Sequence, residues 1–395
     1  MKLIAKIIRT IIVLPKLSSP LSVFPSASSP PLSLPCSVLL FGLWLCHNTA
    51  SSKGDHRVPS KHVALFVFGD SVFDPGNNQF RNIPNDSKAN FWPYGETFFH
   101  FPTGRYTDGR ILPDFLSICL KIPLWKPYLA PGKHYLLHGA NFASGGAAVL
   151  PEYSYEGPAS FSEQLSYFED VAGLLKKQIG DEEAKKMLTE AVYLSSIGGI
   201  DLLASEVYIN GTQAQRQELV NMVIGNITLG IKKIYAVGGR KFAFQNVGPL
   251  GCMPAVRQEA LQEGFNSSDA CYEELLNLAT LHNDALAKAN KELETQLPGF
   301  KYLIYDYYNF LLDRMKNPAE YGFKEGFIGC CGNGTFRGSG CGVKPYELCS
   351  EPSEYVWFDG GHPTEHAYAQ LAKLVWKGGP KATKPFNMKQ LFELD

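Results

Sequence analysis

The stretch that decides the fold prediction is HVALFVFGDS, which runs from His62 to Ser71. Its first seven residues are almost entirely apolar, and Gly69 and Asp70 end the run abruptly before Ser71. A short apolar run that stops at a break of this kind is typical of a fully buried β-strand. Strands that are apolar on both faces belong to parallel sheets covered by helices on both sides. The stretch therefore predicts an α/β protein.

The rest of the chain continues this pattern. Strand-like runs are expected at 191–197, 241–245 and 301–306, and helical spacing of apolar residues at 111–119, 160–179, 213–237 and 272–293, with a last helix starting near Thr364. Alternating strands and helices predict one parallel sheet with helices on both faces. Without an internal repeat or a long linker, we expect a single domain over residues 62–380, followed by a C-terminal tail at 381–395.

The N-terminal segment has a different composition from the rest. Residues 1–54 contain no Asp or Glu, and the apolar run CSVLLFGLWLC (Cys36 to Cys46) has the length of a signal-peptide core. Since this run is too short to span a bilayer, no stable membrane span is expected. We interpret residues 1–52 as a secretory leader and the protein as secreted. An acid-free, Ser-rich leader also fits a transit peptide, which leaves a plastid location as the alternative.

Sequons and cysteines favour secretion. Five N-x-S/T sequons are candidate glycosylation sites, although so short a motif also occurs by chance: Asn85, Asn210, Asn226, Asn266 and Asn333. Of the seven cysteines beyond the leader, four lie in a Gly-rich segment between Cys330 and Cys349, where disulfides would stabilise a segment with little core. Adjacent cysteines and the lack of histidine there disfavour zinc. The odd count predicts one unpaired, buried thiol, which we assign to Cys119.

The overall charge of the chain excludes some partners. The formal net charge of the 395 residues is -1. There is no basic excess to indicate nucleic-acid binding, and no acidic block to indicate a cationic partner.

Two segments carry residues typical of nucleophilic catalysis. Ser71 follows directly after the first strand, where its hydroxyl can point out at the sheet edge, although Ser in such a place is often only a helix cap. Asp359 and His362 are three residues apart just before a predicted helix, so the carboxylate can reach the imidazole and fix its tautomer. Neither segment alone is specific, but together they predict a Ser-His-Asp triad.

A third segment, Gly139 to Ala148 (GANFASGGAA), is rich in glycine. Its backbone N–H groups could bind a tetrahedral oxyanion, and the same composition also suits a tight turn. Because the glycine spacing fits neither dinucleotide-binding nor Walker patterns, nucleotide binding is not expected.

Taken together, these segments resemble the plant GDSL esterase/lipase family of the SGNH hydrolase superfamily. The resemblance rests on three segments, FVFGDSVFDPGNN (66–78), GANFASGGA (139–147) and FDGGHPTEHAY (358–368), which occur in the order of the family's blocks. FWPYGETFF (91–99), PTGRYTDGR (102–110) and NVGPLGCMP (246–254) also look like plant-family segments. The resemblance covers roughly residues 62–380. It implies a three-layer α/β/α sandwich with a flavodoxin-like parallel sheet.

The resemblance also implies roles for individual residues. Ser71 would be the nucleophile, His362 the general base and acid, and Asp359 the residue that orients it. The oxyanion hole would use the N–H of Ser71 and that of Gly146, with Gly145 as the next choice. Acyl transfer on a small-molecule carboxylic ester, from a lipid or a specialised metabolite, would then pass through an acyl-serine. No metal and no organic cofactor would be required.

One position departs from the family pattern. The family's third block carries an Asn that donates to the oxyanion, but Ile200 stands there in the stretch SIGGID (196–201). Loss of one such donor typically lowers the rate by ~10²–10³. Three readings remain open: a hydrolase whose hole is completed by another group, an acyltransferase in which the apolar side chain disfavours water, or a weakly active or non-catalytic ester-binding protein.

Aromatic residues near the first block are a further candidate feature. Phe91, Trp92, Tyr94 and Phe98 are expected either to belong to the core or to line an apolar acyl pocket.

Overall fold

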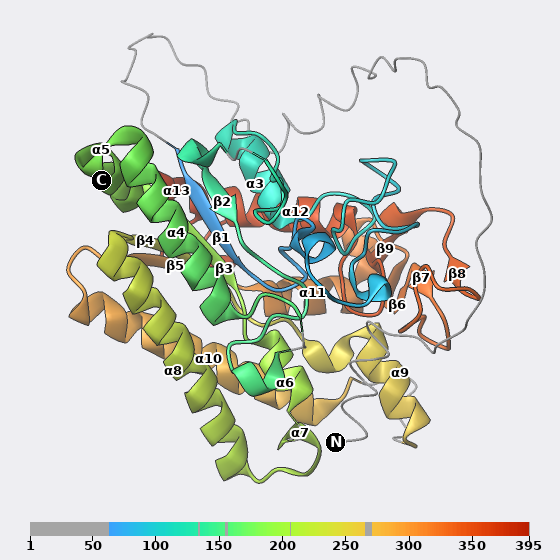
Figure 1. The fold of residues 1–395 in the computed structure, drawn as a ribbon. Coiled ribbons are helices and arrows are strands. Elements are labelled where there is room, and N and C mark those ends of the chain that lie inside the picture. Colours follow the sequence, from blue (N-terminus) through green and yellow to red (C-terminus); the bar gives the residue numbers. More distant parts are fainter. Residues whose placement is uncertain (1–62, 133–134, 155–156, 206, 265–270, 395) are drawn as a thin grey trace, which may run out of the picture.

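A six-stranded sheet forms the centre of the computed structural model, which describes residues 63–394 except 133–134, 155–156, 206 and 265–270 (Figure 1). Five parallel strands lie in the order β2-β1-β3-β4-β5. Their bounds are Leu65–Gly69 (β1), Gly139–Asn141 (β2), Val192–Ser196 (β3), Lys241–Gln245 (β4) and Lys301–Tyr305 (β5). This strand order is that of flavodoxin-like folds, in which ligands bind at the carboxyl ends of the strands where the order reverses, here between β1 and β3.

Residues after 380 are part of this sheet. The short strand β10 (Thr383–Lys384) pairs antiparallel with β5 at the sheet edge, and the helix α13 (Met388–Glu393) buries Met388 and Leu391. The segment set apart as a C-terminal tail thus contributes a strand and a helix to the domain.

Helices cover both faces of the sheet. The helices α4, α8 and α10 pack together on one face, and α3, α12 and α13 pack on the other (Figure 1). The helix bounds are Leu112–Leu120 (α3), Phe161–Ile179 (α4), Asp181–Glu190 (α5), Gly199–Ala204 (α6), Val207–Asn210 (α7), Gln213–Val237 (α8), Pro254–Gln262 (α9), Glu273–Gln296 (α10), Tyr307–Lys316 (α11) and Glu365–Lys377 (α12). The three layers confirm the predicted α/β/α sandwich.

The local sequence explains most of these elements. All five residues of β1, β3 and β4 are buried, as expected for central parallel strands. Ser160 caps α4 and Thr364 caps α12, each accepting a hydrogen bond from a backbone N–H of the first turn. The predicted strands and helices agree with the observed ones to within a few residues. Among the five parallel strands, the one that was not predicted is β2, which is only three residues long and carries no apolar run.

A smaller lobe lies beside the carboxyl end of the sheet. In it β6 (Glu325–Gly329) pairs with β9 (Tyr355–Trp357), and β7 (Cys331–Gly332) pairs with β8 (Glu347–Leu348). The loop with Asp359 and His362 follows β9, so it does not extend from a strand of the central sheet.

Disulfides link the loops, as predicted. They join Cys252 to Cys271, Cys330 to Cys349 and Cys331 to Cys341. The prediction of a free thiol at Cys119 was wrong, because Cys119 is also disulfide-bonded.

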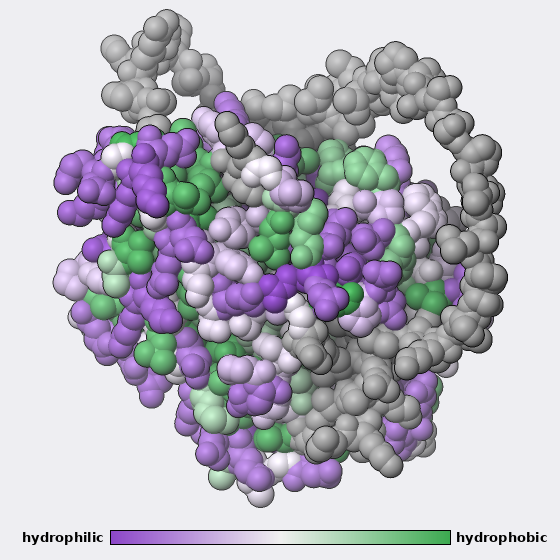
Figure 2. Space-filling model, in the orientation of Figure 1, coloured by the Kyte–Doolittle hydropathy of each residue, from purple (hydrophilic) through white to green (hydrophobic). Residues whose placement is uncertain are grey.

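The surface is mostly polar in the view of Figure 2, most strongly over α5. Among the sequons, Asn85, Asn210 and Asn226 are exposed and Asn333 is half-buried, while Asn266 lies outside the described residues. The predicted leader lies outside them as well. Within the described part of the chain, we find no helix of the length and apolarity needed to cross a bilayer.

Candidate active site

Ser71 lies in a sharp turn at the carboxyl end of β1. Gly69 approaches β3 so closely that a Cβ atom there would lie 2.5 Å from the carbonyl oxygen of Ser196. The next residue, Asp70, donates its backbone N–H to the same oxygen at 3.2 Å. A side chain at Gly69 would therefore separate the turn from β3, which explains the glycine before the Asp-Ser pair.

The side chain of Gln164 holds this turn from α4. Its amide oxygen accepts the N–H of Gly69 at 2.8 Å, and its amide nitrogen donates to the carbonyl of Gly69 at 2.8 Å and to that of Ala159 at 2.9 Å. Gln164 is fully buried. The carbonyl of Gly69 also accepts the N–H of Ser144 at 3.0 Å, whereas Gln164 is the acceptor for the N–H of Gly69, which would otherwise be buried without a partner.

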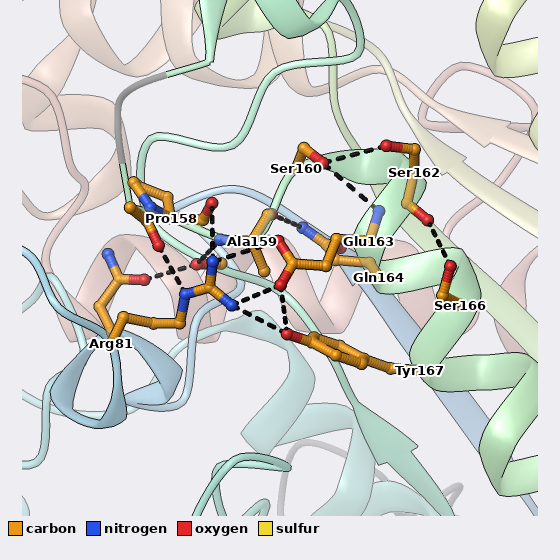
Figure 3. A network of polar contacts seen from close by, with 12 residues as sticks. Arg81, Pro158, Ala159, Ser160, Ser162, Glu163, Gln164, Ser166 and Tyr167 are labelled. Atoms are coloured by element: carbon orange, nitrogen blue, oxygen red, sulfur yellow. Dashed lines mark hydrogen bonds and ion pairs between the residues drawn. The ribbon is translucent and has the colours of Figure 1, made fainter.

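A charged network surrounds the start of α4 next to Gln164 (Figure 3). Arg81 donates to Glu163 at 2.6 Å and to the carbonyl of Gly157 at 2.5 Å, and Tyr167 donates to Glu163 at 2.6 Å. Burial opposes ionisation of Glu163, but the hydrogen bonds from Arg81 and Tyr167 outweigh it and lower its pKa. The network anchors the loop that leads into α4.

The structure brings Ser71, His362 and Asp359 into one hydrogen-bonded chain. The Nε2 atom of His362 lies 2.7 Å from the Ser71 Oγ, and its Nδ1 lies 2.8 and 2.9 Å from the two carboxylate oxygens of Asp359. All three side chains are buried or nearly so. This is the arrangement in which a histidine can take a proton from a serine while a carboxylate stabilises the resulting imidazolium.

Local hydrogen bonds shape the Asp359–His362 loop. The backbone N–H groups of Gly361 and His362 both donate to Asp359 Oδ1 at 2.9 Å. Burial raises the pKa of Asp359, but the charge of His362 and these donors outweigh it, so the net shift is downward. Asp359 is therefore ionised at neutral pH, as an orienting carboxylate must be.

Residues 91–110 support this loop from outside, which sequence reasoning missed. Tyr94 donates its hydroxyl to Asp359 Oδ2 at 2.9 Å, and Thr107 donates to the carbonyl of Pro363 at 2.8 Å. Asp108 accepts the N–H of Glu365 at 2.8 Å. From the sequence, the segments FWPYGETFF and PTGRYTDGR were recognised only because both are similar to segments of the plant family. That similarity was the one signal that could have indicated that both segments support the Asp359–His362 loop.

The four aromatic residues named from the sequence do not lie on the pocket beside Ser71. Trp92 is 51% exposed, and Phe91 packs against a small buried cluster that also contains Tyr94. The guanidinium of Arg110 lies 3.9 Å above the ring of Phe98. Phe91 and Phe98 therefore pack against other side chains, as the first of the two expectations had it, and do not line an acyl pocket.

The glycine segment after β2 offers one clear candidate donor. The N–H of Gly145 donates to Asp74 at 2.9 Å, so it is already engaged. Gly146 adopts a φ of 85°, and neither its N–H nor that of Ser71 has an acceptor within the described residues. Among the predicted oxyanion-hole donors, those two remain available.

Ile200 and Asp201 begin the short helix α6 but differ in surroundings. Ile200 lines the same pocket as Ser71 and His362. Asp201 is buried and accepts the backbone N–H groups of Val149 at 3.0 Å and Leu150 at 2.8 Å. Its carboxylate thus secures the loop that follows Gly146, a role the sequence did not reveal.

A mostly apolar pocket opens beside Ser71, with about 860 Å³ of empty space including its open mouth. Its apolar lining comes from the segments after β3 and β4, from α6 and α11 and from the end of β9: Ile197, Ile200, Leu203, Val247, Pro249, Leu250, Met253, Tyr307, Leu311 and Trp357. Asp70 is the one carboxylate on its wall, and burial raises the pKa of Asp70 to about 6. An apolar lining with a few polar groups is typical of a site for a small organic ligand.

A parallel α/β/α sandwich with serine, histidine and aspartate hydrogen-bonded in series at its carboxyl edge defines the class of serine ester hydrolases. The model of the family described as GDSL-like lipase/acylhydrolase matches residues 65–375, and the chain belongs to this family.

Known plant proteins resemble it over most of their length. The chain is 46% identical over 334 residues to a protein named GDSL lipase from Tanacetum cinerariifolium, covering 84% of this chain and 88% of that one. It is 39% identical over 372 residues to GDSL esterase/lipase 2 of Arabidopsis thaliana, covering 91% and 96%. It is also 37% identical over 360 residues to an Arabidopsis protein named inactive GDSL esterase/lipase-like protein 25, covering 90% and 79%.

Proposed function

We propose that this GDSL ester hydrolase transfers acyl groups from apolar carboxylic esters through an acyl-Ser71 intermediate. The observation that carries the proposal is the hydrogen-bonded chain from Ser71 through His362 to Asp359. The apolar pocket beside Ser71 supports an ester with a hydrocarbon acyl or alcohol part.

The proposed reaction has two halves. In the first, Ser71 Oγ attacks the ester carbonyl carbon while its proton passes to His362 Nε2, and the N–H groups of Ser71 and Gly146 stabilise the oxyanion. His362 then returns that proton to the departing alcohol, which leaves acyl-Ser71. In the second half, water or an alcohol attacks the acyl group and gives its proton to His362, and Ser71 is released with its proton restored.

Replacement of Ser71 tests this function. Ser71→Ala should abolish turnover of a short-chain aryl ester and labelling by a fluorophosphonate probe, both measured on protein made in a host that forms disulfides. Gln217→Leu, a change on α8 that removes only an exposed hydrogen bond to Asn221, is the matched control and should leave both unchanged. Unchanged turnover in Ser71→Ala would remove Ser71 from the mechanism.

Acyl transfer to an alcohol is the second candidate, favoured by one observation. Ile200 places a hydrocarbon group on the pocket wall near Ser71 and His362, where the acceptor must approach. An apolar wall disfavours water relative to a bound alcohol. With a candidate alcohol added at increasing concentration, an acyltransferase gives a rising ratio of new ester to free acid, whereas a hydrolase gives a constant yield of acid.

Two observations favour the third alternative, a non-catalytic ester-binding protein. Ile200 provides no hydrogen-bond donor, and one relative is named inactive. An ester-binding protein of this kind would not be labelled at Ser71 by the fluorophosphonate, which separates it from both enzymes.

We further propose that the protein is secreted. Three disulfides within the described residues and exposed sequons at Asn85, Asn210 and Asn226 support an oxidising, glycosylating route. Peptide N-glycosidase treatment of protein from its native tissue should lower its apparent mass, and plastid import would leave the mass unchanged.

A further inference from the structure

A tyrosine far away in sequence touches the carboxylate of the proposed triad. Tyr94 is 265 residues before Asp359, yet its hydroxyl donates to Asp359 Oδ2 at 2.9 Å in a buried contact. The other oxygen, Oδ1, receives the two backbone N–H groups of Gly361 and His362. The Tyr94 contact is thus the one that holds Oδ2 from outside the loop.

We propose that Tyr94 is a positioning residue that orients the Asp359 carboxylate and takes up part of its negative charge, and this rests on the triad proposed above. With Oδ2 held by Tyr94 and Oδ1 held by the loop, the carboxylate plane is set on both sides. His362 then meets a carboxylate that cannot rotate.

The same small cluster holds both partners of this hydrogen bond. The ring of Tyr94 packs edge-on against Phe358, the residue before Asp359, with centroids 5.5 Å apart, and against Phe91 at 5.4 Å. Cys331 donates its backbone N–H to the carbonyl of Phe358 at 2.7 Å. Because one packed unit carries donor and acceptor, their distance does not depend on loop motion.

Besides Tyr94, the titratable groups that face Asp359 are Tyr106, Tyr368 and His362. Neither of the other two phenols replaces the Tyr94 donor, and the hydroxyl of Tyr368 has no hydrogen-bond partner within the described residues. The hydroxyl of Tyr106 already donates to the carbonyl of Ser87 at 2.6 Å. Burial raises the pKa of all three phenols well above the usual value, so they stay protonated at any working pH.

Loss of the Tyr94 hydroxyl has a defined electrostatic consequence. Without the Tyr94 hydroxyl, the one remaining partner of the buried Oδ2 within the described residues is the Nδ1 of His362 at 2.9 Å, and the carboxylate binds the imidazolium proton of His362 more strongly. The histidine then becomes neutral, and so able to act as a base, only at higher pH. The carboxylate, then held by the loop through Oδ1 alone, would be oriented less firmly, which would lower the maximal rate as well.

Tyr94→Phe tests the inference on a short-chain aryl ester. We expect kcat to fall about tenfold, the order expected for one hydrogen bond to a charged group, with KM nearly unchanged. The acid limb of the kcat/KM profile should move to higher pH by about half a unit. In proton NMR, the low-field resonance of the His362 Nδ1–H should shift, which gives a second reading independent of turnover.

Tyr193→Phe is the matched control. Tyr193 is equally buried, in β3, and donates its hydroxyl to the carbonyl of Leu188 at 2.7 Å, away from the triad. It should lower Tm by a similar amount without moving the pH profile. If Tyr94→Phe behaves like this control, with an unshifted limb and an unshifted resonance, Tyr94 has only a structural role and the inference is wrong.

The triad itself is checked in the same assay. Turnover that persists in Ser71→Ala would overturn the proposed function, whatever Tyr94→Phe does. Ser71-dependent turnover with an unchanged Tyr94→Phe profile would overturn only the role of Tyr94.

Discussion

At the scale of single residues, side-chain amides hold the backbone where strands end. Gln164 binds both the N–H and the carbonyl of Gly69, and Asn283 binds both those of Val247 on the pocket wall. A parallel strand that stops at the carboxyl edge leaves such groups without a ladder partner. An Asn or Gln carries one donor and one acceptor group and so satisfies a whole peptide unit.

Replacement of Gln164 should therefore destabilise the protein. Gln164→Leu leaves the N–H of Gly69 and the carbonyl of Ala159 unpaired in the interior, whereas the carbonyl of Gly69 keeps the N–H of Ser144 at 3.0 Å. We expect the free energy of unfolding to fall by about 2–4 kcal/mol. Urea unfolding measures it, with Gln217→Leu as the control. Equal midpoints for the two variants would show that the amide contributes nothing.

Ile200 sets a second prediction at this scale. Ile200→Asn restores an amide on the pocket wall beside Ser71, and we expect kcat to rise by about tenfold or more, since one oxyanion donor is typically worth more than that. Steady-state kinetics on the aryl ester checks it, and Ile200→Leu, which keeps the side chain apolar, should change little. A flat response to Ile200→Asn would mean that another donor completes the hole.

At the scale of elements, the disulfide-bonded segment after β6, residues 330–349, supports the loop that carries Asp359 and His362. Cys330 and Cys331 donate their backbone N–H groups to the carbonyls of Trp357 and Phe358, directly before Asp359. The segment has few apolar residues of its own, so covalent links replace a hydrophobic core.

Removal of one link should measure this support. The double change Cys331→Ser and Cys341→Ser opens a disulfide of sequence separation 10, and the chain entropy that the unfolded state regains predicts about 3 kcal/mol less stability. Denaturant unfolding gives the value, and kcat should fall with it because the loop before Asp359 loosens. A variant with the wild-type midpoint would argue that the hydrogen bonds alone suffice.

At the scale of the whole molecule, buried carboxyl groups make stability depend on pH. Burial raises the pKa of Asp70 and Asp108 to about 6 and that of Asp74 and Asp201 to about 7. The folded state therefore binds more protons than the unfolded chain at pH values between about 4 and 7. The stabilisation that this provides is complete below pH 4 and is lost as the pH rises to about 7.

Other groups act in the opposite direction over part of this range. Burial lowers the pKa of His282 to about 4, so its contribution is present above the unfolded value near 6.5 and is lost on acidification. The pKa of Glu96 is also raised to about 7, and the lowered pKa values of Glu163 and Asp359 act below the ordinary carboxyl range, so the net effect between pH 5 and pH 8 favours mild acid.

We therefore expect Tm to be higher at pH 5 than at pH 8. Differential scanning calorimetry at constant ionic strength checks this. Asp201→Asn, which keeps a carbonyl acceptor for the N–H groups of Val149 and Leu150, should reduce the difference. A Tm that rises from pH 5 to pH 8 would contradict the prediction.

The sequence by itself determined the features that depend on neighbours along the chain. The apolar run before Ser71 predicted a buried strand, because burial on two faces requires consecutive apolar residues. The Asp359 and His362 pair was predictable because three residues fit within one turn. The alternation of strands and helices then led to the sandwich, and the strand order followed from the resemblance to a known family.

Only the tertiary structure decided which distant groups meet. Tyr94 reaches Asp359 and Gln164 reaches Gly69 across 265 and 95 residues, and neither spacing has a local signature. The N–H of Gly145 is engaged by Asp74, and Cys119 is disulfide-bonded, for the same reason. Hydrogen bonds and disulfides of this kind form between groups that packing brings together, and packing depends on the whole chain at once.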